Sequence, residues 1–354
     1  MTATVWSLDL YDRAGASVLT PLPFMSLKAT WQLNAPGTLE FDLQYQGTPT
    51  YVNMSPGIRT VKLSRSATVI WGGDLSHLSA NAESRTVRGE ADGWWAKARQ
   101  RVIDADLIYT DTAPTSQQQI AWDIINHFQG QSNGSLSFTQ GTHTGATVNR
   151  NRHYCGLTER PNAGQAVEDF TDLDDGFDFE IDPATRQFNT WSPQRKTDLT
   201  GSIILNETNL MSLDWEESTR DMANTITGLG ADDCGPIADD IVDATLQATY
   251  GRLQDIVQSN RNEASEIDAQ AREELRIRKR PLFTAHVAFY ETAGPAWGTY
   301  ALGDLVTLAP TKYFSTFNRP LRISGISLSL EAGGSHGTGT GLPFYELELT
   351  NAKD

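Results

Sequence analysis

The sequence predicts a mainly β fold with an inserted α+β segment. Two stretches, residues 1–92 and the part after about residue 210, consist of short apolar runs separated by turn residues, which is typical of strands. Helix-like spacing of apolar residues is found mainly between these two stretches. Because 354 residues exceed the size at which a single core stops growing, we predict three domains: residues 1–92, 93–210 and 211–354.

The first domain is predicted to be all β. Apolar and polar residues alternate in short runs, and turn residues such as Asp12–Gly15 and Pro56–Gly57 separate these runs. The expected strands are Val5–Tyr11, Thr38–Leu43, Arg59–Leu63 and Thr68–Trp71. Strands this short and regularly separated are typical of a small barrel or sandwich.

The middle domain is predicted to mix helices and strands. A helix is expected over Ser116–Phe128, where Ser116 and Gln119 match a capping box. The segment Gly130–Asn151 is rich in Gly, Ser, Thr and Asn, which predicts a long loop or a weak hairpin. The other expected elements are helices at Gly93–Arg101 and Gly164–Leu173 and a pair of strands at Phe177–Ile181 and Gln187–Trp191.

The last domain is predicted to return to strands around one long, charged helix. That helix is expected over Ser259–Arg280 and ends at Pro281. Its apolar stripe (Ala264, Ile267, Ala271 and Leu275) is narrow, so we expect it to be solvated on most sides or covered by another subunit. The expected strands are Ala223–Gly230, Leu282–Tyr290, Asp304–Leu308, Leu321–Leu330 and Phe344–Leu349. Their order resembles that of the first domain, but residue identity is low, so the repeat is weak.

The net charge of −16 and the pI of about 4.8 exclude some classes of partner. Nucleic-acid affinity comes largely from Lys and Arg, and an acidic surface disfavours anionic membranes, so we expect neither kind of stable binding. Only Cys155 and Cys234 are present, which argues against a disulfide framework. We see neither a signal peptide nor an apolar run of membrane-spanning length and expect synthesis and folding in a cytoplasm.

Two groups of residues invite a metal-site interpretation, and we reject both. The first is an acidic stretch whose Gly176 and Glu180 stand at the wrong offsets for a calcium loop, so a helix end, a turn and a solvated strand face explain it better. Its members are Asp172, Asp174, Asp175, Asp178, Glu180 and Asp182. The second is His143, His153 and Cys155, which lie in a polar loop without a recognisable fourth ligand.

Candidate enzyme and sugar-binding features are equally weak. Gly333–Gly337 matches GxSxG, but it stands between predicted strands and not in the strand–turn–helix context that a nucleophile elbow needs. No two of the 44 acidic residues are singled out as a glycosidase pair. Trp94, Trp95, Trp191 and Trp297 could form a sugar platform, although buried aromatic packing is the better interpretation. We therefore assign no catalytic, cofactor-binding or metal-binding residue and expect no cofactor.

Several short segments, taken in chain order, resemble a known family. They are Asn34–Phe41, Trp71–Gly73, Gly164–Glu168, Gly176–Pro183, Asn224–Gly228, Tyr250–Arg252, Ala271–Leu275 and Gly303–Leu308. Their order is similar to that of the hub proteins of tailed-phage tail tips and baseplates, often labelled minor tail proteins in phages of actinobacteria. Residues 130–151 and the Gly-rich gap before Phe344 have no counterpart in the family pattern.

The resemblance implies a trimeric ring in which two similar small β-barrel domains flank the α+β middle domain. It implies contacts with the distal tail protein, the tape-measure protein and other minor tail, tip or fibre proteins, with DNA only in transit. We therefore expect a structural, non-enzymatic virion protein at the tail tip, made in the cytoplasm of the host bacterium. The alternatives are a distal tail protein forming a hexameric ring, a tail-associated cell-wall hydrolase and a carbohydrate-binding protein.

Overall fold

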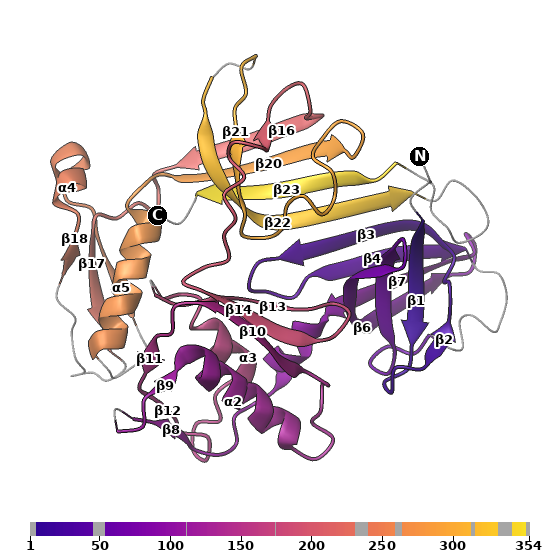
Figure 1. Ribbon diagram of the computed structural model, residues 1–354, viewed down its shortest axis with the longest axis horizontal. Helices are drawn as coiled ribbons and strands as arrows, with labels where there is room; N and C mark the ends of the chain where they lie inside the picture. The colour runs from indigo at the N-terminus through magenta and orange to yellow at the C-terminus, as the bar shows by residue number, and fades with distance from the viewer. Residues whose placement is uncertain are drawn as a thin grey trace.

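The strands of both ends of the chain form one large sheet in the computed structural model (Figure 1). The structure describes residues 5–44, 54–110, 112–173, 175–230, 240–258, 264–312, 316–331 and 342–351. Thirteen of the described strands belong to this sheet, most of them antiparallel, and the main path runs β16-β20-β23-β22-β3-β4-β7-β6-β5-β1-β2. The first half contains β1 (Trp6–Tyr11), β2 (Ser17–Leu19), β3 (Phe24–Gln32), β4 (Thr38–Gln44), β5 (Thr60–Arg65), β6 (Thr68–Asn81) and β7 (Thr86–Gly93). The second contains β15 (Ile204–Leu205), β16 (Ser212–Ser218), β20 (Leu282–Tyr290), β21 (Leu305–Leu308), β22 (Arg319–Glu331) and β23 (Phe344–Asn351).

The two halves are joined by an antiparallel pairing of β3 with β22, from Gly325 opposite Gln32 to Glu331 opposite Ser26. Both strands alternate apolar and polar residues, so their apolar side chains fall on one face and share one continuous core. The mainly β prediction with an α+β insertion is confirmed. The prediction of two separate barrels is corrected, because the strands of both halves form one sheet. Each half pairs with an edge strand of the other that would otherwise be exposed. Among the described strands, neither half closes into a barrel.

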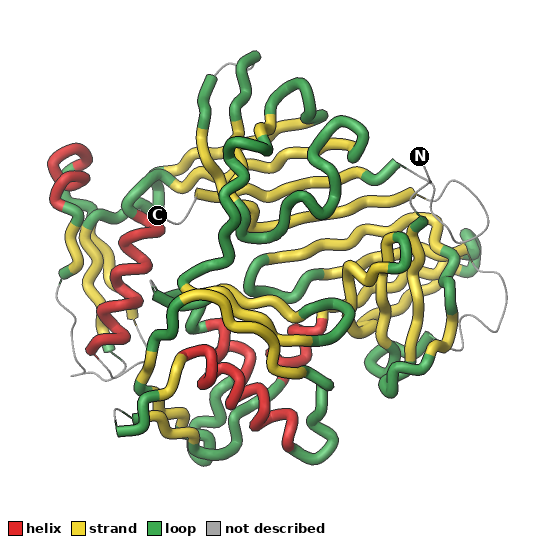
Figure 2. The backbone as a smooth tube through the Cα atoms, in the orientation of Figure 1, coloured by secondary structure: helices red, strands yellow, loops and turns green. Residues whose placement is uncertain are grey.

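The middle part packs two helices and a set of short strands beside this sheet (Figure 2). Its elements are η1 (Trp94–Gln100), β8 (Leu107–Tyr109), β9 (Thr115–Ser116), α2 (Gln117–Gly130), β10 (Thr139–Gly145), β11 (Asn149–Arg150), β12 (Arg152–Tyr154), α3 (Ala163–Glu168), β13 (Asp178–Ile181) and β14 (Gln187–Ser192). The apolar residues Ile120, Ile124, Ile125 and Phe128 of α2 form one stripe, which is fully buried in a second core. Ser116 accepts a hydrogen bond from Gln119 N (3.1 Å), but the Gln119 side chain binds Asp123 (2.7 Å), so only half of the capping box forms.

The polar segment Gly130–Asn151, predicted to be a long loop or a weak hairpin, contains a strand of a different pairing. Its residues Thr139–Gly145 form β10, which pairs in parallel with β14 as an edge strand of a three-stranded sheet. Most side chains of β10 are exposed, so the segment lacks the alternating pattern that reveals a strand. The side chain of Asn189 helps to hold it by accepting a hydrogen bond from Thr142 N (2.9 Å).

A small lobe follows, built from β17 (Thr225–Leu229), β18 (Ile241–Val242), α4 (Ala244–Tyr250), β19 (Gln254–Gln258) and α5 (Ala264–Arg278). Helix α5 covers the strands at the left of Figure 1. Ala271 and Leu275 of α5 pack with Ile226 of β17, while Ala269 reaches the core of the middle part. This side of the helix therefore packs against two parts of the same chain, which corrects the prediction that most of its sides are solvated. Arg272 and Ile277 stay exposed, and cover by another subunit stays a prediction. The predicted start at Ser259 lies outside the described residues.

Candidate functional site

One face of the large sheet is polar and strongly acidic. Strand alternation turns the apolar side chains toward the core and leaves every second residue on the opposite face. In register across neighbouring strands, Asp214 lies opposite His286, and His286 lies opposite Glu348. The carboxylates of this acidic face are Glu40, Asp42, Glu90, Asp92, Asp214, Glu216, Glu331, Glu346 and Glu348, and its exposed cations are Lys28 and Arg88.

These two cations neutralise only part of the acidic face. Lys28 pairs with Glu346 (3.4 Å). Arg88 pairs with both Glu40 and Glu90, which stand directly opposite each other and would otherwise repel. Asp214, Glu216 and Glu348 have no ion-pair partner among the residues that the structure describes. A shallow cleft of about 300 Å³ lies over this end of the face, with Asp214, His286, Glu346 and Glu348 in its lining. The acidic face therefore keeps a large excess of negative charge.

A buried ion pair joins the middle part to the sheet. Asp178, at the start of β13, pairs with Arg322 of β22, and their side chains are only 1% and 6% exposed. Asn34 Nδ2 donates to Asp178 Oδ1 (2.8 Å), and Arg195 N donates to Asp178 Oδ2 (2.5 Å). Arg322 also donates to the carbonyl of Arg195 (3.2 Å). One carboxylate of the middle part is thus bound to both halves of the sheet, which fixes the relative position of all three.

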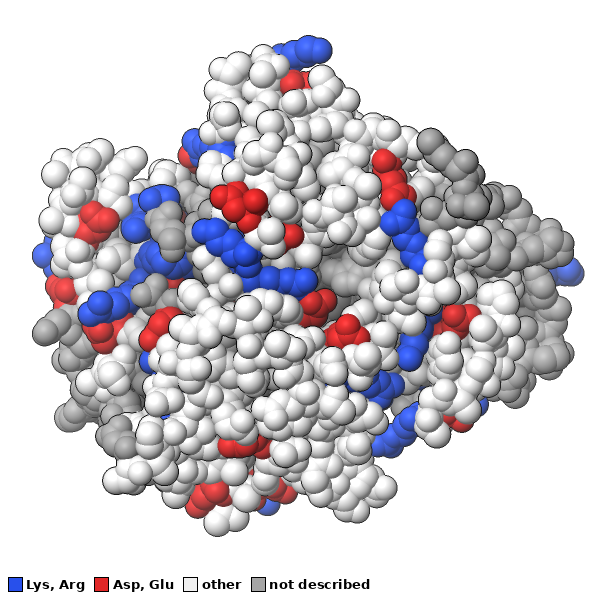
Figure 3. Space-filling model, viewed as in Figure 1, with Lys and Arg blue, Asp and Glu red and all other residues white. Residues whose placement is uncertain are grey.

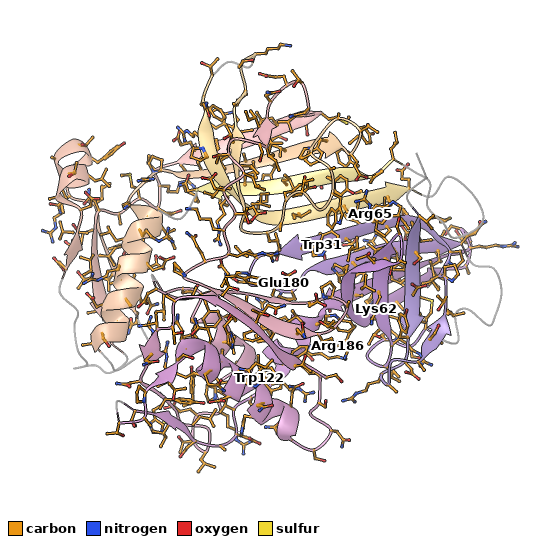
Figure 4. All side chains as sticks on the ribbon, in the orientation of Figure 1. Trp31, Lys62, Arg65, Trp122, Glu180 and Arg186 are labelled. Atoms are coloured by element: carbon orange, nitrogen blue, oxygen red, sulfur yellow. The ribbon has the colours of Figure 1, made fainter. Side chains whose placement is uncertain are left out.

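The rim of this joint is partly aromatic. Figure 4 shows Trp31 and Glu180 on facing elements, one from the first half of the sheet and the other from the middle part. Trp31 Nε1 donates to the carbonyl of Ile70 (3.0 Å), and Glu180 pairs with Arg195. The Arg195 guanidinium lies over the Trp191 ring, 4.5 Å from its centroid. A small cavity of about 70 Å³ remains between the two surfaces, so the joint is closely packed.

Gly72 of β6 allows the backbone of the middle part to approach the sheet. A β-carbon at this position would lie 2.7 Å from the carbonyl oxygen of Pro183 and 2.7 Å from Trp94 Nε1. We expect Gly72→Ala to destabilise the protein by about 1–3 kcal/mol, because a backbone atom cannot rotate away. Thermal unfolding would measure this. Gly201→Ala is the matched control, since nothing lies within 4 Å of its added carbon; equal melting temperatures of the two variants would contradict the close approach.

The acidic stretch of the middle part was predicted to be a helix end, a turn and a solvated strand face, and the structure corrects the strand face. Asp178 is buried in the joint, and Glu180 pairs with Arg195. Asp175 pairs with Arg150, and Asp182 accepts hydrogen bonds from the backbone of Thr185 (2.7 Å) and Ala184 (3.0 Å). Asp174 lies outside the described residues. These carboxylates therefore hold the chain together and are not grouped around a cation.

The remaining candidates are dispersed. His143 Nδ1 lies 2.6 Å from Thr190 Oγ1, whereas the Cys155 sulfur is 3.9 Å from His153 Nε2. Among the described residues, no three His, Cys, Asp or Glu side chains are placed to hold a metal ion. The segment Gly333–Gly337 lies outside the described residues. No helix in the described part of the chain is long and apolar enough to cross a membrane.

The four candidate tryptophans differ in burial. Trp94 and Trp95 are 4% and 2% exposed, so neither offers a ring face to a sugar. Trp297 lies against Trp31 (ring centroids 5.1 Å apart) and Tyr345 (5.5 Å). Trp191 is covered by the Arg195 guanidinium. Buried aromatic packing, the preferred interpretation of the sequence, is therefore confirmed for Trp94 and Trp95, whereas Trp191 and Trp297 are only partly buried.

Solved structures of tail proteins share this fold over the full chain. Prophage tail protein gp18 of Listeria monocytogenes EGD-e matches with a TM-score of 0.62 and 13% identity, covering 98% of this chain and 95% of that one. The 43 kDa tail protein of prophage MuSo2 from Shewanella oneidensis matches with a TM-score of 0.65 and 12% identity, covering 97% of each chain. The E. coli c3393 protein matches with a TM-score of 0.52 and 12% identity, covering 98% of this chain and 76% of that one.

The third of these proteins is described as a component of the type VI secretion system with structural similarity to T4 bacteriophage tail proteins gp27 and gp5. No protein-family model and no curated protein sequence matches the chain. Identity is low in all three structural matches, so they show the fold alone. This chain has the fold of phage tail proteins and of a related secretion-system component.

Proposed function

We propose that this chain is a structural hub of a phage tail tip. The observation that carries the proposal is the agreement of its fold with prophage tail proteins over nearly the whole of both chains. The likeness to a secretion-system component compared with T4 gp27 and gp5 further supports a place at the end of a tail. The actinobacterial host stays a prediction from the sequence.

In the proposed assembly, three copies form a ring at the end of the tail tube. The two sheet halves, contributed by residues 1–92 and by strands from 211–354, act as similar modules, so three chains match the six-fold tube above. The ring binds the distal tail protein on one side and tip or fibre proteins on the other. Closed rotational symmetry requires repeated contacts between the copies. The role proposed for the chain is therefore assembly and not catalysis.

The acidic face gives this proposal a physical role for the sheet. We place it toward the channel through which the tape-measure protein and then DNA pass. Nine carboxylates against two cations repel phosphates, so DNA would not adhere to the wall during transit. The cations pair within the face and leave Asp214, Glu216 and Glu348 free to act on a passing chain.

Charge reversal on the acidic face tests this role. In phage particles carrying Asp214→Lys and Glu348→Lys, we expect normal assembly but DNA release slowed several-fold, because the new ammonium groups would bind phosphates. Fluorescence of a DNA-binding dye after triggered release would measure the rate. Asp106→Lys with Glu159→Lys, two exposed carboxylates of the middle part, changes the net charge equally and serves as the control. Equal rates in the two variants would contradict a channel position for the face.

A further inference from the structure

A basic cleft lies between the first half of the sheet and the middle part. It encloses about 660 Å³. Its charged lining residues are Arg13, Asp74, Lys97, Arg101 and Arg186. Four basic side chains thus face one carboxylate in a chain whose net charge is −16. A local excess of positive charge is therefore built into an otherwise acidic protein.

Two arginines of the cleft are held in place by backbone carbonyls. Arg13 donates to the carbonyl oxygens of Asn133 (3.1 Å) and Ser135 (3.4 Å). Arg186 donates to the carbonyl oxygen of Leu136 (2.9 Å), and its guanidinium lies 3.9 Å from the centroid of the Trp94 ring. Carbonyl groups fix the direction of a guanidinium without cancelling its charge. Both groups therefore remain oriented and able to bind an anion through their other N–H donors.

The single carboxylate that lines the cleft, Asp74, forms an ion pair within it. Asp74 pairs with Lys97 (2.6 Å). Within the described ranges of the chain, no carboxylate pairs with Arg13, Arg101 or Arg186. The charge of Asp74 also acts on Arg186 from beyond ion-pair distance, so the cleft holds four basic side chains against this one carboxylate.

A further cation, Lys62, lies close to Arg186 where the sheet meets the middle part (Figure 4). Figure 3 shows Lys and Arg atoms in a row along this junction. Burial, and then the nearby Arg186 charge, lower the pKa of Lys62 from its usual value. Asp9 is opposite Lys62 in strand register, yet the Lys62 ammonium lies over the Tyr11 ring, 5.2 Å from its centroid. Lys62 therefore adds positive charge at the edge of the cleft.

We propose that this cleft binds a short acidic peptide segment of a partner protein through two or three carboxylates. Arginine forks match carboxylate geometry, and the volume lies within the range of sites that enclose a small ligand. Densely charged polyanions such as DNA are disfavoured, because the whole chain repels them more than it repels a short peptide.

We take this partner to be another tail protein, and that step rests on the proposed function, whereas the preference of the cleft for carboxylates does not. Binding by the purified chain is measured without assembly of a ring. A failure of the hub proposal and a failure of this one are therefore distinguishable.

Fluorescence anisotropy with the purified full chain tests the proposal. The probe is a labelled octapeptide of alternating Glu and Ser, and its counterpart carries Gln in place of Glu. We expect the Glu peptide to bind and the Gln peptide not to bind. The double variant Arg13→Glu/Arg101→Glu should weaken binding of the Glu peptide by about tenfold or more, since two attractive charges become repulsive.

Two further variants of the chain separate a loss of binding from a loss of folding. Arg101→Glu alone alters a side chain that binds no described residue, so it leaves the Arg13 contacts intact and should still weaken binding several-fold. Arg220→Glu/Arg252→Glu changes the net charge as much as the double variant but lies outside the cleft, and it should bind normally.

Three results would overturn the proposal. The first is equal binding of the Glu and Gln peptides, and the second is equal loss in the cleft variants and the control. The third is no binding of the Glu peptide while tripolyphosphate or single-stranded DNA binds in a manner that depends on Arg101, which would assign the cleft to phosphates.

Discussion

Replacing Asp178 with alanine is expected to lower the free energy of unfolding by about 3–5 kcal/mol. The change leaves Arg322 charged in a site where its side chain is only 6% exposed, and a buried charge without a partner is costly. It also removes the acceptor for Asn34 Nδ2 and Arg195 N. Because these partners belong to both sheet halves and to the middle part, their relative position should loosen. Urea unfolding followed by circular dichroism measures the loss.

The exposed pair between Asp240 and Arg252 provides the control for that prediction. Its side chains are 39% and 54% exposed, so Asp240→Ala should cost less than about 1 kcal/mol. If Asp178→Ala is no more destabilising than Asp240→Ala, the buried ion pair does not hold the two sheet halves and the middle part together.

Replacing Trp95 with alanine is the second substitution with a large expected effect, again about 3–5 kcal/mol. Trp95 is 2% exposed, and its ring lies 4.8 Å from Phe179 and 6.1 Å from Phe188, measured between centroids. Its Nε1 donates to Glu168 Oε1 (2.6 Å). The substitution leaves a cavity at the centre of the middle core and removes a donor from Glu168, so unfolding should begin in the middle part.

Hydrogen exchange locates that effect. Amides of α2 should lose protection in Trp95→Ala, while those of β22 and β23 in the large sheet keep theirs. Trp122→Ala is the control, because Trp122 is only partly buried at the margin of the same core (Figure 4). A uniform loss of protection across both cores would show that the middle part has no core of its own.

Local structure was largely predictable from the sequence, because each element carries its own signal. Alternation identified strands such as Thr38–Leu43 and Phe344–Leu349, and apolar spacing identified α2. Strand β10 was missed for a local reason, since its side chains are almost all exposed and follow no period. The burial of α5 was missed because alanines at its contacts gave only a narrow apolar stripe.

Long-range contacts could not be predicted in this way. The pairing of β3 with β22 joins segments near opposite ends of the chain, and neither strand carries a signal that names its partner. The joint likewise binds Asp178 to Arg322, 144 residues away. In the sequence, Arg322 stands between Leu321 and Ile323, which predicts an outward, solvated position. Only the fold shows that the middle part covers it there.

The distribution of charge over the surface also depends on long-range contacts and could not be predicted from the sequence. The net charge of −16 was visible in the composition, but not the division between an acidic sheet face and a basic cleft. Both surfaces depend on which neighbours the strands acquire. Lys97 and Arg186, for example, face the same cleft although they come from distant parts of the chain.

In the proposed assembly, this chain forms a three-fold hub whose acidic face lines the channel of a tail tip. Electron microscopy of the intact particle, with the copy number and symmetry of this chain determined directly, tests it. We predict three copies in one ring, with the face that carries Asp214, Glu346 and Glu348 turned toward the axis. Six copies in a six-fold ring, or a three-fold ring with that face turned outward, would contradict it.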